Sequence, residues 1–333
     1  MDSMPEFELR RPTSIVEAAA ILAEAPAARL LAGGTDLVPS MRRGIERPAV
    51  LVDITQVRGF AEVEVTNAGL VLGAGVTLAT LAGDPRIARG GAALAEAART
   101  VAGPGHRSVA TIGGNLCLDT RCVFYNQSAW WRAANAWCLK LDGEVCHVAP
   151  QGKHCHAAFA GDLAPALLAL EAEIEVVATR GIRRIPLAQL YRDDGAAHLT
   201  VARDEVLARV FVPASPAGLA SGYRKARVRG AIDFPLAGVA CALALRGTAL
   251  SVLKVALTGT NSRPIMLDGT DAFLGQPVDD ALLASLRKLV QKQVSPMRTT
   301  VTHADYRRQV AVVLAQRLVR ELSEGRPSDV PAR

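Results

Sequence analysis

The chain contains few aromatic residues: phenylalanine, tryptophan and tyrosine make up 4% of its 333 residues. No apolar run approaches the roughly 18 residues that a membrane-spanning helix requires, so no membrane segment is expected. The formal net charge of +6 is modest, and no basic stripe with interleaved aromatic residues occurs, so nucleic-acid binding is not expected. The N-terminal residues lack the basic start and apolar stretch of a secretory signal, which makes a cytoplasmic location the expectation.

Familiar motifs of catalysis and nucleotide binding are also missing. The sequence has no G-x-G-x-x-G fingerprint, no P-loop and no arrangement that resembles a nucleophile paired with a base. Half of the residues are hydrophobic, and the chain is long enough for two or three domains with cores of their own. We therefore expect a globular protein whose chemistry does not depend on catalytic side chains.

One segment differs sharply in composition from the rest. Residues 117–155 hold five of the six cysteines and all three tryptophans. In a reducing compartment, clustered cysteines indicate metal ligands before disulfides. Four thiolates can hold an iron–sulfur cluster or a zinc ion. Zinc is favoured by the neighbouring His147, His154 and His156, but closely spaced cysteine pairs are missing except for Cys117-x4-Cys122.

Two glycine turns precede this segment. Residues 30–37 place Gly33 and Gly34 between an expected strand and a short helix that ends near Met41. Such a turn can direct backbone N–H groups at a phosphate. Asp36 would be unwelcome beside a phosphate and is expected to cap the helix. The second turn, residues 111–115, is followed by no obvious helix, and the two turns together favour a pyrophosphate clamp.

Hydrophobic periodicity and capping signals predict alternating helices and strands. Thr13 or Ser14 can cap the first helix, with Glu17 placed for a capping box. Residues 213–218 are rich in proline and small residues and indicate a linker. Helices are predicted at residues 15–24, 92–100, 163–170, 281–291 and 303–322, and strands at 29–32, 50–53, 70–74, 172–177, 184–186, 206–212, 235–245 and 250–257.

Several motifs occur together in an order that resembles the FAD-binding subunit of molybdenum hydroxylases. They are residues 30–37, Val-Ala-Gly-Pro at 101–104, residues 111–115, Asp-Leu at 162–163, Lys-x-Arg at 225–227 and Asp-Phe-Pro-Leu at 233–236. The group includes the medium subunits of xanthine dehydrogenase and carbon monoxide dehydrogenase. The resemblance covers essentially the whole chain. It implies an α+β fold, with a two-part FAD-binding domain of the vanillyl-alcohol-oxidase type before a smaller α+β domain of the CO dehydrogenase flavoprotein C-terminal type.

The resemblance also implies domain limits and cofactor contacts. The expected parts are FAD-binding subdomain 1 at 1–58, subdomain 2 at 59–215 with a cysteine-rich insertion at 117–158, a C-terminal domain at 219–325 and a flexible tail at 326–333. The implied FAD contacts are Leu30, Leu31, Ala32, Gly33, Gly34, Thr35, Asp36 and Leu37 at the pyrophosphate, Val101 and Ala102 at the flavin, Thr111, Gly114 and Asn115 in the second clamp, Asp162 at the ribose or adenine, and Leu207 and Lys225 nearby. Without the resemblance, Asp162 could be an N-cap, Lys225 a surface lysine, and Arg107 either a phosphate ligand or solvent-facing.

The insertion resembles that of the β subunit of 4-hydroxybenzoyl-CoA reductases, which implies a [4Fe–4S] cluster. Cys117 follows Asn115 too closely to turn freely towards a cluster and is interpreted as a small apolar residue, while Cys241 lies in a core strand. Trp130, Trp131 and Trp137 are expected to give the insertion apolar cover. The freer cysteines are also those that the resemblance implies as ligands: Cys122, Cys138, Cys146 and Cys155.

The implied function is electron transfer in a larger enzyme. By the resemblance, the partners are a molybdopterin-binding large subunit and a [2Fe–2S] small subunit, usually as (αβγ)2. Electrons would enter from ferredoxin at the cluster, reach FAD and then molybdenum. There the hydroxyl of 4-hydroxybenzoyl-CoA is removed to give benzoyl-CoA, a step of anaerobic aromatic degradation. Two alternatives stay open: the same subunit in a molybdenum hydroxylase that works oxidatively, or a zinc-stapled module without redox function.

Overall fold

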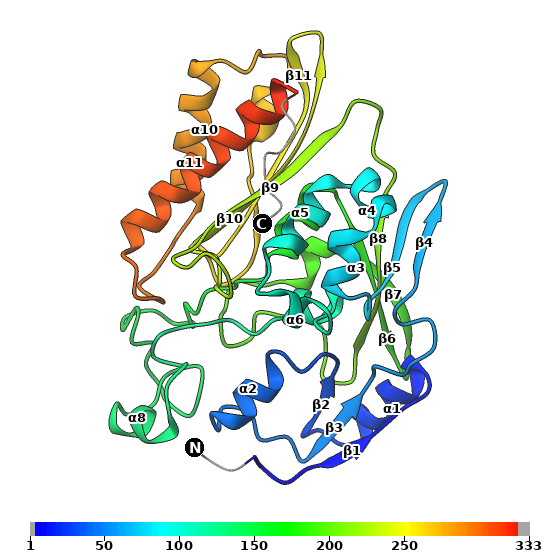
Figure 1. Ribbon diagram of the computed structural model, residues 1–333. Coiled ribbons are helices and arrows are strands. Elements are labelled where there is room, and N and C mark those ends of the chain that lie inside the picture. Colours follow the sequence, from blue (N-terminus) through cyan, green and yellow to red (C-terminus); the bar gives the residue numbers. More distant parts are fainter. Residues whose placement is uncertain (1–3, 326–333) are drawn as a thin grey trace.

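The computed structural model describes residues 4–325 and contains three sheets (Figure 1). The first sheet is parallel, in the order β1 (Glu8–Arg10), β3 (Val50–Asp53), β2 (Ala28–Leu31), with helices α1 (Ile15–Glu24) and α2 (Leu37–Arg42) beside it. The predicted capping box is confirmed, because Glu17 N–H donates to Ser14 Oγ at 3.2 Å and Thr13 N–H donates to the Glu17 carboxylate at 2.7 Å.

The second sheet has five antiparallel strands, and most of the remaining helices pack around it. The strand order is β4 (Val63–Thr66), β5 (Gly69–Gly73), β8 (Val206–Pro213), β6 (Glu173–Ala178) and β7 (Gly181–Pro186). The accompanying helices are α3 (Leu78–Gly83), α4 (Pro85–Gly90), α5 (Ala92–Thr100), α6 (Pro104–Arg107), α7 (Ile112–Leu116), α9 (Leu163–Ala169) and the 3₁₀ helix η1 (Leu187–Leu190). All seven residues of α9 are buried, which places this helix at the centre of the main core.

The third sheet is covered on one face by two long helices (Figure 1). Its antiparallel order is β12 (Ile265–Met266), β11 (Ala249–Thr258), β10 (Ala237–Arg246), β9 (Ala220–Ala226). The 3₁₀ helix η2 (Thr270–Phe273) precedes the covering helices α10 (Asp280–Gln293) and α11 (Ala304–Ser323). Cys241 is fully buried in this second core, as expected.

The cysteine-rich insertion lies between α7 and α9 and contains one six-residue helix, α8 (Ala129–Ala134). Its base is closed by an antiparallel bridge, in which Arg121 and Ala158 exchange N–H···O bonds of 2.8 and 2.9 Å. Beyond the base, Val123 N–H donates to Thr299 O at 2.8 Å, and Gly195 N–H donates to Cys155 O at 2.8 Å. The insertion is therefore attached both to the second unit and to the third, C-terminal unit, where each unit is one sheet with its helices.

The α+β class predicted from the sequence is confirmed, and β3 and α5 occupy the predicted residues. The sequence missed β9, and it missed α7, which is formed by the second glycine turn itself; the next helix along the chain, α8, begins at Ala129. Within residues 4–325, no helix has the length and apolar character needed to cross a membrane. The tail expected at 326–333 lies outside the described residues.

Candidate functional site

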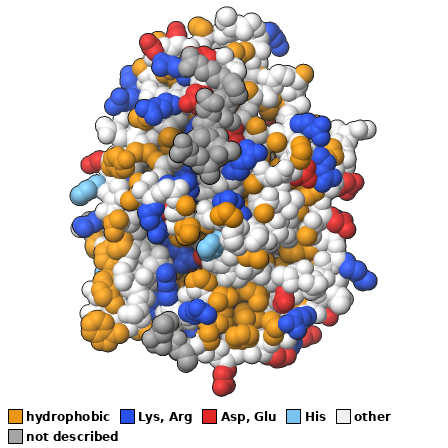
Figure 2. All heavy atoms as spheres, in the orientation of Figure 1, with side chains coloured by type: hydrophobic (Ala, Val, Ile, Leu, Met, Phe, Trp, Pro, Cys, Tyr) orange, Lys and Arg blue, Asp and Glu red, His pale blue; other side chains and the backbone are white. Residues whose placement is uncertain are grey.

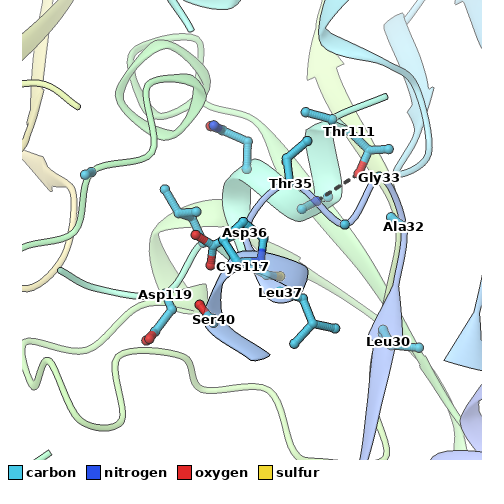
Figure 3. Close-up of a pocket in the computed structure, with 18 of the residues that line it drawn as sticks. Leu30, Ala32, Gly33, Thr35, Asp36, Leu37, Ser40, Thr111, Cys117 and Asp119 are labelled. Atoms are coloured by element: carbon cyan, nitrogen blue, oxygen red, sulfur yellow. Dashed lines mark hydrogen bonds between the residues drawn. The ribbon is translucent and has the colours of Figure 1, made fainter. Parts of the chain in front are cut away.

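A cavity of about 770 Å³ lies where the three units meet, within the size range of small-molecule sites. All sixteen positions implied as FAD contacts line it, although they come from segments far apart in the sequence. Figure 3 shows residues of the first glycine turn together with Thr111, Cys117 and Asp119 of the cavity wall. The structure thus brings the whole predicted set together, and the individual contacts with FAD stay a prediction.

The first glycine turn leaves its backbone donors available to the cavity. A Cβ on Gly33 would lie 2.1 Å from Val109 O, and Gly34 has a φ of +68°, so both positions require glycine. In the described part of the chain, the N–H groups of Gly33, Gly34, Thr35 and Asp36 have no intramolecular acceptor. Backbone N–H groups before a helix are suited to a phosphate.

Asp36 does not cap α2, contrary to the sequence expectation, because its side chain accepts no bond from the helix. Its carboxylate instead forms an ion pair with Arg121 of the insertion. The partner lies 85 residues away in sequence, so no local pattern could have predicted the pair.

In the second turn, unlike the first, most of the backbone N–H groups form hydrogen bonds within the protein. Thr111 Oγ1 accepts the Gly114 N–H at 3.1 Å and so caps α7. Asn115 Oδ1 accepts the Leu163 N–H at 3.0 Å, which gives Asn115 the capping role at α9 that the sequence had allowed for Asp162. The second turn therefore fixes α9 to the cavity wall and offers a phosphate fewer free backbone donors than the first.

Asp162 and Lys225 form a buried ion pair. Lys225 Nζ lies 3.0 Å from Asp162 Oδ2, and the two side chains are 2% and 4% exposed. The Tyr223 hydroxyl donates to Asp162 Oδ1 at 2.6 Å, and burial, with a smaller effect of this carboxylate, raises the pKa of Tyr223 far above its usual value. Asp162 is thus no simple N-cap and Lys225 no surface lysine.

The expected flavin side of the cavity contains a strained residue. Ala102 has a φ of +44°, a left-handed conformation that is uncommon for a residue other than glycine. Arg107 Nη1 donates to Val101 O at 2.9 Å and to Ala102 O at 3.3 Å. Arg107 therefore holds this segment in place; it is half-buried and does not line the cavity.

Sequence reasoning missed several residues of the cavity wall, including Arg121, Asp119 and His198. His198 is buried with Nε2 3.0 Å from Leu118 O, and burial lowers the pKa of His198 to about 4. Cys117 packs on the main core, as expected, but also faces the cavity, and burial raises the pKa of its thiol to about 12. Of these cavity residues, only Cys117 could have been predicted from the sequence, because it lies two residues after Asn115, an implied FAD contact.

The four cysteines predicted as ligands are buried and lie near one another. Burial raises the pKa of Cys122, and the nearby Cys146 and Cys138 raise it further. Burial likewise raises the pKa of Cys155 to about 12, with Cys146 and Cys122 adding to the shift. Ile45, Tyr125 and Ala157 pack around these sulfurs. Among residues 4–325, no group of three or more His, Cys, Asp or Glu side chains is arranged to hold a metal ion.

One buried cation faces this cluster of cysteines. Lys140 Nζ lies 2.6 Å from Asp119 Oδ1, donates to Gly195 O at 2.9 Å and also bonds to Thr120. Its charge acts on Cys155 and favours a thiolate there. Asp119 also lines the cavity, so this hydrogen-bonded group lies between the two predicted cofactor sites.

The tryptophans do not cover the insertion as a group. The Trp131 and Phe124 rings lie 6.2 Å apart, and the Arg132 guanidinium lies 5.7 Å from the Trp137 ring. Trp130, by contrast, is 78% exposed, so its predicted role as cover was wrong. Figure 2 shows hydrophobic side chains gathered on the surface over α8.

Comparison with known proteins identifies the class to which this fold and cavity belong. Residues 5–215 match the FAD binding domain in molybdopterin dehydrogenase, and residues 221–322 match the CO dehydrogenase flavoprotein C-terminal domain. The chain belongs to this family of FAD-binding subunits of molybdenum hydroxylases.

Particular relatives agree with this assignment. The chain is 34% identical over 295 residues to the aldehyde oxidoreductase FAD-binding subunit of Escherichia coli K12, covering 85% of this chain and 91% of that protein. It is 25% identical over 319 residues to the nicotine 6-hydroxylase medium subunit of Paenarthrobacter nicotinovorans, covering 96% and 98%. The fold is similar to that of a reconstituted CO dehydrogenase from Oligotropha carboxidovorans, with a TM-score of 0.80 at 23% identity and coverage of 97% and 99%. None of these three is named a 4-hydroxybenzoyl-CoA reductase.

Proposed function

We propose that this chain is the FAD- and [4Fe–4S]-carrying electron-transfer subunit of a molybdenum enzyme. The observation that carries the proposal is that four buried cysteines lie in the insertion whose residue Arg121, next to Cys122, lines the same cavity as all sixteen implied FAD contacts. When bound, FAD and the cluster supply the redox chemistry, while the chain supplies binding, spacing and electrostatics. The subdivision into residues 1–58, 59–215 and 219–325, with the insertion at 117–158, is part of this proposal.

FAD fits the cavity. The free N–H groups of the first glycine turn would hold the pyrophosphate, and Ala102 with its strained backbone would contact the flavin. Asp162 would position the ribose or adenine while Lys225 compensates its charge. Leu207, from β8, adds apolar wall.

We place a [4Fe–4S] cluster rather than zinc at these cysteines. Four buried cysteines are available, Cys122, Cys138, Cys146 and Cys155, and a cubane cluster takes four thiolates. Structural zinc sites usually contain closely spaced cysteine pairs, and none occurs among these four. His147 and Phe124 have ring centroids 5.3 Å apart, which gives this histidine a packing role.

For the reaction, we propose oxidation of an aldehyde or a similar substrate at a molybdopterin-binding large subunit. The subunit names of the relatives at 34% and 25% identity, an aldehyde oxidoreductase and a hydroxylase, favour this direction. Electrons would then arrive through a [2Fe–2S] small subunit and leave at the insertion towards ferredoxin, in an assembly such as (αβγ)2. The second candidate is 4-hydroxybenzoyl-CoA reductase, with the reverse flow, and the cysteine-rich insertion supports it.

The test is to purify the complex anaerobically and to measure flavin, iron and sulfide in this separated subunit. We expect one FAD, four iron and four sulfide per chain. A flavin-free chain with one zinc would contradict the proposal. Mixing the complex with an aldehyde or with reduced ferredoxin plus 4-hydroxybenzoyl-CoA then decides the direction. Bleaching of flavin absorbance by the aldehyde supports oxidation, and formation of benzoyl-CoA supports the reductase.

A further inference from the structure

Arg121 joins the two predicted cofactor sites. It directly precedes the predicted ligand Cys122, and its side chain, only 11% exposed, lines the cavity. One end of the guanidinium pairs with Asp36, and Nη1 donates to Asn126 Oδ1 at 3.2 Å. The third nitrogen, Nε, is buried and has no hydrogen-bond partner in the structure. Among the described residues, hydrogen bonds to Asp36 and Asn126 alone therefore hold the side chain at the cavity wall.

Asp36 explains why a cation is needed at this position. Its carboxylate lies in the first glycine turn, among the free N–H groups that would hold a pyrophosphate. An unpaired carboxylate there would repel a second anion. Pairing with Arg121 removes this repulsion, and no other ion-pair partner of Asp36 occurs among residues 4–325.

We infer that Arg121 is the residue by which the insertion completes the FAD site. Its guanidinium neutralises Asp36, so that this carboxylate no longer repels an anion in the cavity, most simply the FAD pyrophosphate. The inference rests on the proposed FAD site and adds a residue from outside the implied contacts. Because the bridge to Ala158 fixes the Arg121 backbone, this role belongs to the base of the insertion and does not require the cluster.

The test is a double-mutant cycle on the purified complex after flavin removal, with FAD rebinding followed by fluorescence quenching. We expect R121Q to raise the Kd for FAD by about tenfold, because Asp36 is left unpaired beside the pyrophosphate position. D36N should weaken FAD binding less than R121Q does, and D36N/R121Q should recover most of the R121Q loss, because no unpaired carboxylate remains in the double variant. R58Q is the matched control, since Arg58 is exposed and lies outside the cavity wall.

Iron content separates this role from a general structural one. All four proteins should keep wild-type iron, because the substitutions leave the backbone bridge and the cysteines in place. An unchanged Kd for FAD in R121Q would overturn this inference but leave the proposed function standing. Loss of iron together with FAD in R121Q would also overturn it, since Arg121 would then hold up the insertion. A double variant as weak as R121Q would refute the neutralisation of Asp36. Wild type that binds no FAD would overturn the proposed function as well.

Discussion

The buried ion pair between Asp162 and Lys225 gives a sharp test of the site, through the substitution K225M. Asp162 precedes α9 in the second unit, and Lys225 lies on β9 in the third, so the pair joins two sheets at the cavity wall. Methionine is close to lysine in size, so the substitution removes the charge and little volume. The carboxylate would keep the bond from Tyr223 but lose its counter-charge.

The expected cost follows from this burial. Removing one partner of a buried ion pair leaves an uncompensated charge and costs about 3–5 kcal/mol. For large domains about 1 kcal/mol corresponds to roughly 2–4 °C, so K225M should lower the melting temperature by at least about 6 °C. The double variant D162N/K225M should be less destabilised than K225M, because no buried charge remains.

The measurement is thermal unfolding of the FAD-loaded subunit by circular dichroism. The matched control is K254M, since Lys254 pairs with Glu171 at 3.3 Å on the surface, with 33% and 66% exposure. An exposed pair contributes about 0–1 kcal/mol, so K254M should change the melting temperature little. Equal melting temperatures for K225M and K254M would refute the reasoning.

Three further predictions follow from other parts of the site. C138S should remove cluster iron but leave FAD largely bound, with C117S as the control that keeps iron; retained iron in C138S would mean that the ligand set is wrong. G33A should weaken FAD binding more than G34A, because its methyl group would meet Val109 O at 2.1 Å while G34A adds only left-handed strain of about 1 kcal/mol; fluorescence titration of FAD measures both, and equal affinities would contradict the difference. The pKa of His198 is about 4 in the folded protein and about 6.5 in the unfolded chain, so on acidification the unfolded chain binds the proton first. The free energy of unfolding should therefore fall by about 3 kcal/mol as the pH drops from 6.5 to 4. Urea unfolding of H198N should show a smaller loss over this pH range.

Local signals in the sequence predicted much of the fold. The capping box at Glu17 and the alanine-rich α5 appear where the pattern placed them, because short-range hydrogen bonds and helix propensity act within one turn. Helix α7 was missed because two glycines occupy its centre, and glycine disfavours a helix unless tertiary contacts compensate. Strand β9 was missed because its polar residues do not alternate clearly.

The sequence predicted many of the residues that line the cavity, but it did not predict the hydrogen bonds and ion pairs that these residues form with one another. The positions implied by the resemblance all reached one cavity, whereas the partners of Asp36, Asn115 and Asp162 did not follow from the sequence. Each of these bonds joins residues at least 48 positions apart. Capping rules consider only neighbours in the chain, so they predicted Asp36 as the cap of α2 and allowed Asp162 as the cap of α9. In the structure neither side chain caps its helix, and Asn115 accepts the N–H at the start of α9 instead.

The order of residues at the base of the insertion places the first predicted cluster ligand next to the cavity. Cys117 and Arg121 line the cavity, and Cys122 is the next residue after Arg121. Neighbouring Cα atoms are about 3.8 Å apart, so the first proposed cluster ligand begins one residue from the cavity wall. The Arg121–Ala158 bridge holds this base independently of the rest of the insertion. In the proposed electron-transfer subunit, the base would fix Cys122 relative to the cavity, whereas Cys138 and Cys146 follow α8, so their positions depend on how the rest of the insertion folds.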